Sequence, residues 1–176
     1  GGGVMAAAWT DRILDAGAKL GLDLSAQQAQ LLADYLALIQ KWTKVYNLTA
    51  VRDPEEMLTH HLFDSLSVIA PLQRQLVAMG KGEAARLLDV GSGAGLPGVV
   101  VAICCPGVKV DCVDTVGKKA AFIQQVAVSL GLKNLRGVHA RVESLTEGYD
   151  VVSSRAFASL VDFTTWSRSA VGEGGV

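Results

Sequence analysis

The sequence has little cysteine, almost no net charge and no long apolar run. Its three cysteines, Cys104, Cys105 and Cys112, lack CxxC spacing and a matching set of histidines. We therefore expect small buried apolar side chains and no disulfide framework or metal site. The net charge of −1 excludes a generic polyanion binder, so an RNA-binding role would need local basic clusters.

No apolar run approaches the ~20 residues that span a bilayer. The apolar segment over residues 5–16 carries Asp11, Arg12 and Asp15, which is not typical of a secretory signal. We expect a soluble, cytoplasmic protein without a membrane partner. Its 176 residues, half of them hydrophobic, suffice for one α/β core with an appendage.

Helical periodicity dominates the first half of the chain. Apolar spacing predicts helices over residues 6–20 and 26–46, the second with Ser25 as its N-cap. Asp53 and Pro54 predict another helix start, with helix continuing to about residue 76 and a possible break at Pro71. We predict an N-terminal helical cap over residues 1–84.

From residue 86 the pattern changes to alternating strands and helices. Strands are predicted at 86–90, 109–114, 135–140 and 149–153, and helices at 97–105, 118–130 and 160–170. This alternation predicts an α/β fold with a Rossmann-like, doubly wound parallel sheet over residues 85–176.

A glycine-rich loop interrupts the first strand pattern. The apolar run ends in Asp89-Val90 and continues as Gly91-Ser92-Gly93-Ala94-Gly95. Glycines there permit positive φ and let a ligand approach the bare backbone. A strand, such a loop and a helix start are typical of a nucleoside-cofactor site.

Two cofactors fit this loop. Gly93 to Gly98 satisfies the GxGxxG pattern, and Asp114 follows about 20 residues later, as NAD-binding sheets require. The GxGxG pattern after Asp89 instead resembles the first motif of class I methyltransferases, which bind S-adenosylmethionine. There the acid and the loop hold the methionine end, and an acid like Asp114 holds the ribose. No later segment supplies a hydride-transfer site, so we favour S-adenosylmethionine.

Further matching stretches make the resemblance specific. In order they are residues 45–49, 61–66, 89–98, 114–122, 141–143 and 154–160. Together they resemble the bacterial ribosomal RNA small-subunit methyltransferase G family, also called glucose-inhibited division protein B. The resemblance implies methyl transfer from S-adenosylmethionine to N7 of a specific guanosine in 16S ribosomal RNA, with S-adenosylhomocysteine as product. Because the family continues past residue 176, we expect the C-terminal strands of the sheet to be missing.

The family pattern also assigns residues. It implies cofactor contacts at Gly91, Leu96, Val142, Glu143 and Arg155, with Leu96 and Val142 acting through backbone or apolar contact. The class I motifs add Gly93 and Asp114. Arg155, at the carboxyl edge of the sheet, is the one catalytic candidate.

Guanine N7 carries a lone pair and no proton, so its methylation needs orientation and no general base. Candidates for contact with the base are Tyr46, Asn47, His61 and Phe157, although Tyr46 and Phe157 also suit a core and His61 suits helix packing. Lys118 and Lys119 could meet RNA phosphate.

Two other functions stay open from the sequence. One is a class I methyltransferase that acts on another substrate. The other is a non-catalytic RNA-binding module with a vestigial cofactor pocket. We expect a monomer that acts on 16S ribosomal RNA or on the small-subunit particle.

Overall fold

The computed structural model describes residues 2–46, 57–82, 84–91, 93–145, 148–157 and 160–165. Helices fill the first part of the chain, as predicted. They are α1 Gly2–Lys19, α2 Ala26–Tyr46, the π-helix η1 Met57–Leu62, α4 Phe63–Ser67 and α5 Ile69–Ala78. The sheet region contains β1 Arg86–Val90, α6 Gly98–Cys104, β2 Lys109–Asp114, α7 Gly117–Leu130, β3 Leu135–His139, the 3-10 turn η2 Val142–Ser144, β4 Val151–Phe157 and β5 Leu160–Thr165.

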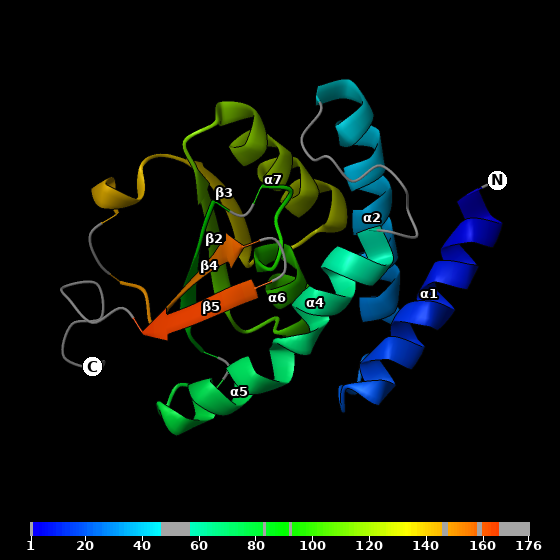
Figure 1. The fold of residues 1–176 in the computed structure, drawn as a ribbon, viewed down its shortest axis with the longest axis horizontal. Coiled ribbons are helices and arrows are strands. Elements are labelled where there is room, and N and C mark those ends of the chain that lie inside the picture. Colours follow the sequence, from blue (N-terminus) through cyan, green and yellow to red (C-terminus); the bar gives the residue numbers. More distant parts are fainter. Residues whose placement is uncertain are drawn as a thin grey trace.

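The five strands form one sheet in the order β3-β2-β1-β4-β5 (Figure 1). Strands β1 to β4 are parallel to one another, which confirms the predicted parallel sheet. The order places β1 in the middle, between β2 and β4. The loops that follow β1 and β2 therefore meet at the same, carboxyl edge of the sheet.

The prediction of a helix over residues 160–170 is wrong for residues 160–165. These form β5, which pairs antiparallel with β4 from Val151↔Thr165 to Phe157↔Leu160. Val161, Phe163 and Thr164 are β-branched or aromatic residues that favour extended backbone, and the edge of β4 offers them hydrogen-bond partners. The remaining residues of the predicted helix lie outside the described ranges.

The predicted break at Pro71 is also wrong, because the interruption between α4 and α5 falls at Val68. Pro71 is the third residue of α5, within the first turn, where a helix has no internal partner for a backbone N–H. Proline therefore costs no helical hydrogen bond there. The predicted helix start at Asp53 and Pro54 lies outside the described residues.

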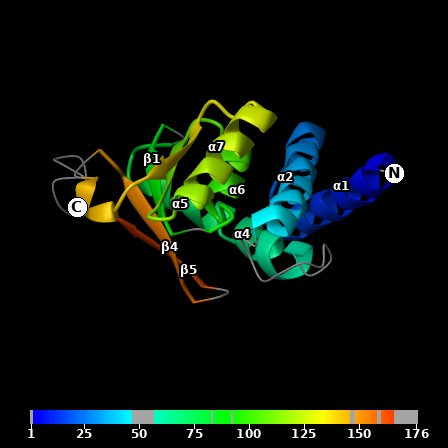
Figure 2. The ribbon, with the colours of Figure 1, turned by 90° about the horizontal axis from the view of Figure 1, so that it is seen from above.

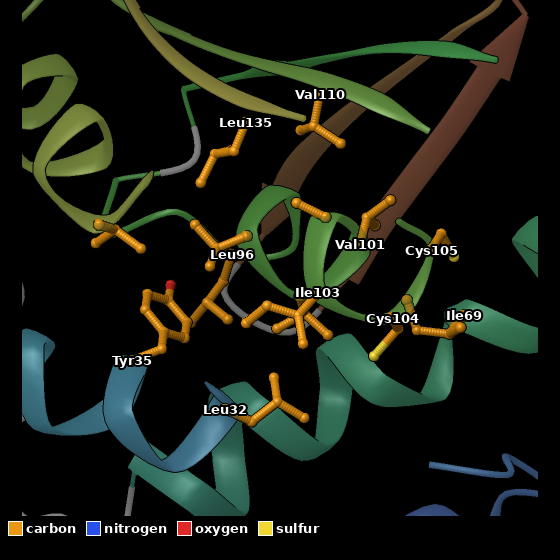
Figure 3. Packing of buried hydrophobic residues seen from close by; sticks show 14 of the residues in the cluster. Leu32, Tyr35, Ile69, Leu96, Val101, Ile103, Cys104, Cys105, Val110 and Leu135 are labelled. Carbon is orange, nitrogen blue, oxygen red and sulfur yellow. The ribbon is translucent and has the colours of Figure 1, made fainter. Parts of the chain in front are cut away.

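One face of the sheet carries the main hydrophobic core. Helices α1, α2, α4, α5, α6 and α7 all contribute to it, and Figures 2 and 3 show this helical layer against the sheet. Every residue of α6 is buried, because this short apolar helix lies between the sheet and the N-terminal helices. The N-terminal helices thus share one core with the sheet. The division at residue 84 into cap and core stays a prediction.

The other face carries a smaller cluster of Leu88, Val113 and Tyr149. On this face Asp111 is paired with Leu88, the middle residue of β1. Its buried carboxylate accepts hydrogen bonds from Arg136 Nε and Nη2, at 2.9 and 2.8 Å, and from the Tyr149 hydroxyl at 2.6 Å. Burial by itself would raise the pKa of Asp111, but these hydrogen bonds and the positive charges of Arg136 and Arg86 outweigh burial and lower it. The cluster links β2, β3 and the segment before β4.

The three cysteines are buried and form no disulfide, which confirms the prediction of small apolar core residues. Among the described residues, no helix has the length and apolar character needed to cross a membrane.

Candidate functional site

The outer side of the glycine loop is open. Gly91 and Gly93 adopt φ of +64° and +63°, and a Cβ at either position would meet no atom of the described part of the chain within 4 Å, apart from its chain neighbours. Gly91 N–H donates to the Val113 carbonyl at 3.0 Å, which fixes the start of the loop against the end of β2. Positive φ explains why both positions need glycine. The space beside them lies at the carboxyl edge of the parallel strands, where α/β sheets bind ligands.

The inner side of the loop is packed tightly. Gly95 has φ +105°, and a Cβ there would lie 2.6 Å from both Ile123 and Val99. Leu96 is 6% exposed and belongs to the main core. Its side chain therefore points into the protein, so that only its backbone remains for a cofactor contact.

Asp89 shapes the loop from within. It lies in register with Cys112 of β2 and Ser153 of β4, and it is 0% exposed. Its carboxylate accepts hydrogen bonds from Gly98 N–H at 2.8 Å and from the Ser153 hydroxyl at 2.9 Å. The expectation that this acid holds the methionine end does not fit its complete burial, and we assign Asp89 a supporting role beneath the loop.

Asp114 ends β2 beside the loop and is half-buried. Its Oδ1 accepts the Val116 N–H at 2.8 Å, and its carbonyl accepts the Ala140 N–H at 3.1 Å. A ring nitrogen of His139 also lies 3.1 Å from the Thr115 carbonyl. The Asp114 side chain and the end of β3 thus hold the turn after β2. The Asp114 carboxylate lies at the same edge of the sheet as Gly91.

His139 is a further side chain at this edge that no sequence motif indicated. It is the residue of β3 paired with Asp114, and a Cβ on Gly117 would lie 3.4 Å from its ring. The sequence places His139 near the end of the strand predicted at residues 135–140. Only the strand order, in which β3 lies next to β2, shows that this position is beside Asp114.

The other predicted residues of the sheet region surround this edge. Lys118 is exposed and Lys119 half-buried, both in the first turn of α7. Val142 and Glu143 form part of η2 after β3, where Val142 packs against the smaller core cluster and Glu143 is exposed. No group of histidine, cysteine or acidic side chains among the described residues could hold a metal ion.

Arg155 is placed by its backbone. Pairing of β1 with β4 ends at Val90↔Ser154, so Arg155 follows directly, within an irregular part of the β4–β5 pairing. Because Val90 precedes Gly91, Arg155 lies level with the start of the loop. Its side chain and that of Phe157 lie outside the described part of the structure.

The remaining base candidates are resolved unequally. Tyr46 is the last residue of α2, with its side chain outside the described part, and Asn47 lies outside the described residues altogether. His61 is half-buried in η1. The Trp42 ring, one turn before Tyr46, lies 5.3 Å from the Phe122 ring of α7, so the end of α2 runs beside α7 (Figure 1).

Comparison with known proteins decides between the two cofactors that fit the sequence of this loop. A family model described as "rRNA small subunit methyltransferase G" matches residues 28–176. This chain belongs to that family. The match confirms the resemblance found in the sequence, and it covers the glycine loop, Asp89, Asp114 and β4.

Curated relatives agree with the family assignment. Proteins named ribosomal RNA small subunit methyltransferase G are 67% identical over 161 residues in Acidovorax ebreus (strain TPSY) and 65% identical over 171 residues in Paracidovorax citrulli (strain AAC00-1). The alignments cover 89% and 93% of this chain, and 71% and 70% of those proteins.

Solved structures are more distant. Coclaurine N-methyltransferase bound to N-methylheliamine and SAH has a TM-score of 0.41 and 17% identity, covering 88% of this chain and 49% of that one. MtNAS in complex with MTA and tNA has a TM-score of 0.40 and 20% identity, covering 78% of this chain and 54% of that one.

Proposed function

We propose that this protein transfers a methyl group from S-adenosylmethionine to N7 of one guanosine in 16S ribosomal RNA and releases S-adenosylhomocysteine. The observation that supports this most is the pairing of an open glycine loop with an acid at the next strand end, in a chain of this family. Gly91 and Gly93 leave backbone accessible, and Asp114 presents a carboxylate at the same edge.

The residues suit a nucleoside with a positively charged tail. Backbone at Gly91, Gly93 and Leu96 would hold the amino-acid end, and Asp114 would accept hydrogen bonds from the ribose hydroxyls. Glu143 would accept a hydrogen bond from the adenine amine, with Val142 offering apolar contact. When bound, S-adenosylmethionine supplies the methyl carbon, which N7 attacks with its lone pair as the carbon–sulfur bond breaks and the positive charge passes to the purine ring.

No proton leaves N7 before attack, so the protein's task is orientation. Holding N7 in line with the methyl group supplies up to roughly 7–11 kcal/mol of rate enhancement in the best-oriented reactions. Arg155, level with the start of the loop, would engage the target nucleotide and turn N7 toward the methyl group. Tyr46, Asn47 and His61 are the candidates for contact with the base.

RNA binding would use positively charged side chains near this edge. Lys118 and Lys119 begin α7, directly after the turn that carries Asp114, and would contact phosphates that flank the target. Because N7 faces the major groove, the guanosine must be unpaired or turned outward.

A matched pair of glycine variants tests the cofactor site. Gly93 and Gly131 have nearly equal φ, +63° and +66°, and among the described residues nothing beyond the chain neighbours lies within 4 Å of a Cβ at either position. Gly93→Ala and Gly131→Ala should therefore lose similar stability, about 1–2 kcal/mol for left-handed backbone. Only Gly93→Ala should also weaken S-adenosylhomocysteine binding in calorimetry. Equal binding by both variants would remove Gly93 from the site.

Methyl transfer tests the reaction itself. Small ribosomal subunits that lack the modification are incubated with labelled S-adenosylmethionine, and cleavage at 7-methylguanosine maps the product. Arg155→Ala should abolish transfer while the protein stays folded, and Arg74→Ala, at an exposed residue of α5, should leave it unchanged. Unchanged turnover by Arg155→Ala would remove Arg155 from the site.

The same assay separates the alternatives. Label at another position or on another molecule would indicate a methyltransferase with a different substrate. RNA binding with no affinity for S-adenosylhomocysteine would indicate a non-catalytic module. We further propose that the protein acts as a monomer in the cytoplasm, where its substrate is assembled, and light scattering of the purified protein would measure its mass.

A further inference from the structure

One buried hydroxyl joins the N-terminal helices to the glycine loop. Tyr35, in the middle of α2, is 0% exposed, and its hydroxyl donates a hydrogen bond of 2.7 Å to the carbonyl of Ala94. Figure 3 shows Tyr35 rising from α2 beside Leu96. The two partners lie 59 residues apart in the sequence, so this bond connects the helical region directly to the loop.

The bond acts on the inner side of the loop. A Cβ on Gly95 would lie 3.2 Å from the Tyr35 hydroxyl, and Ala94 and Leu96 are only 8% and 6% exposed. The open side, at Gly91 and Gly93, belongs to the same short loop. Tyr35 therefore holds the inner side of the same loop whose outer side is open.

Helix α2 holds Tyr35 at a fixed place. Seven residues earlier, Gln28 Nε2 donates to the Ile103 carbonyl at the end of α6, at 3.3 Å. Seven residues later, Trp42 lies against Phe122 of α7. Because an α-helix is stiff over such a length, with about 1.5 Å of rise per residue, these contacts leave little freedom for the Tyr35 hydroxyl.

We propose that Tyr35 is a positioning residue for the cofactor, through which the N-terminal helices set cofactor affinity. This inference rests on the proposed function, in which the loop holds S-adenosylmethionine. Tyr35 does not touch the cofactor. It fixes the Ala94 carbonyl. Without the hydroxyl, that buried carbonyl loses its hydrogen-bond donor, and the loop samples other positions relative to β1.

The test compares two tyrosines. Tyr35→Phe removes only the hydroxyl. Tyr149→Phe removes the same atom from another buried tyrosine, 4% exposed, which precedes the start of β4 and donates to Asp111 on the other face of the sheet. Tyr35→Phe should raise the dissociation constant for S-adenosylhomocysteine about tenfold, the effect of one buried hydrogen bond. It should raise KM for S-adenosylmethionine equally, with kcat at saturating cofactor and KM for ribosomal subunits unchanged.

A second measurement reports on the loop without any cofactor. Hydrogen–deuterium exchange at residues 93–99 should be faster in Tyr35→Phe than in the unaltered protein, and unchanged in Tyr149→Phe. Gln28→Ala, which removes an anchor of α2 at a distance, should raise the dissociation constant in the same direction by a smaller factor. This variant decides the question if Tyr35→Phe fails to fold.

The inference would be overturned if Tyr35→Phe bound S-adenosylhomocysteine within twofold of the unaltered protein and showed the same hydrogen–deuterium exchange at residues 93–99. An equal loss of affinity in Tyr149→Phe would also overturn it, because the effect would then reflect general loosening. If the unaltered protein binds no S-adenosylhomocysteine, the proposed function fails and the cofactor role of Tyr35 with it. Failure of the inference alone leaves binding by the unaltered protein intact.

Discussion

Gly98 tests how tightly the loop is held from below. It is the first residue of α6, and it donates its N–H to the buried carboxylate of Asp89 at 2.8 Å. A Cβ at this position would lie 2.5 Å from Asp89 Oδ2 and 2.5 Å from Cys112 Sγ. Gly98→Ala must therefore push α6 away from β1 and β2, since Asp89 and Cys112 are buried, at 0% and 2% exposed.

The cost follows from two contacts. Overpacking a core by one carbon costs about 1–3 kcal/mol, and loss of a hydrogen bond to a charged group costs about 1.5–3 kcal/mol. Alanine gains less than the ~1 kcal/mol of a helix interior, because Gly98 begins the helix. The expected loss of unfolding free energy is about 3–5 kcal/mol, a large part of the ~5–15 kcal/mol typical of a folded protein.

Thermal and urea unfolding measure this loss. For a chain of this size each kcal/mol lowers Tm by about 2–4 °C, so Gly98→Ala should lower it by about 6–20 °C. Gly93→Ala, where a Cβ has no neighbour within 4 Å in the described parts of the chain, should lose only the smaller cost of left-handed backbone. If Gly98→Ala unfolds within about 2 °C of the unaltered protein, the close contact between α6 and Asp89 is not as described.

Three further predictions concern groups away from the loop. The hydrogen bonds of Asp111 lower its pKa below the ordinary 3.8 despite burial. Its contribution to the free energy of unfolding is therefore present above that pH and lost as the pH falls below it. Acid unfolding should show this loss, and Asp111→Asn should lack that part of the pH dependence. Burial raises the pKa of the Cys104 thiol to about 12, so thiol reagents at neutral pH should label it only after denaturation, and rapid labelling of the folded protein would contradict its burial. Asn134→Ala should cost about 2–3 kcal/mol in urea unfolding, because its amide donates to the carbonyls of Ala102 and Val108 at 3.0 and 2.9 Å; a loss under about 1 kcal/mol would mean that these carbonyls find other partners.

Local sequence signals predicted most of the elements. The Ser25 cap placed the start of α2 correctly, since the Gln28 N–H donates to the Ser25 hydroxyl and the Ser25 N–H donates to Gln28 Oε1. The strand at 109–114 and the helix ending at Leu130 also match. The segment 160–165 failed because its residues suit a strand as well as a helix, and pairing with β4 decided between them.

The sequence by itself determined the family, the alternation of strands and helices, and the glycine loop, because each depends on residues close together along the chain. Only the tertiary structure decided which residues meet. Strand order brought His139 beside Asp114, packing buried Asp89 and the Leu96 side chain, and the seat of α2 placed the Tyr35 hydroxyl against Ala94. Contacts between distant residues depend on how the elements pack together, and no local pattern of residue types specifies that packing.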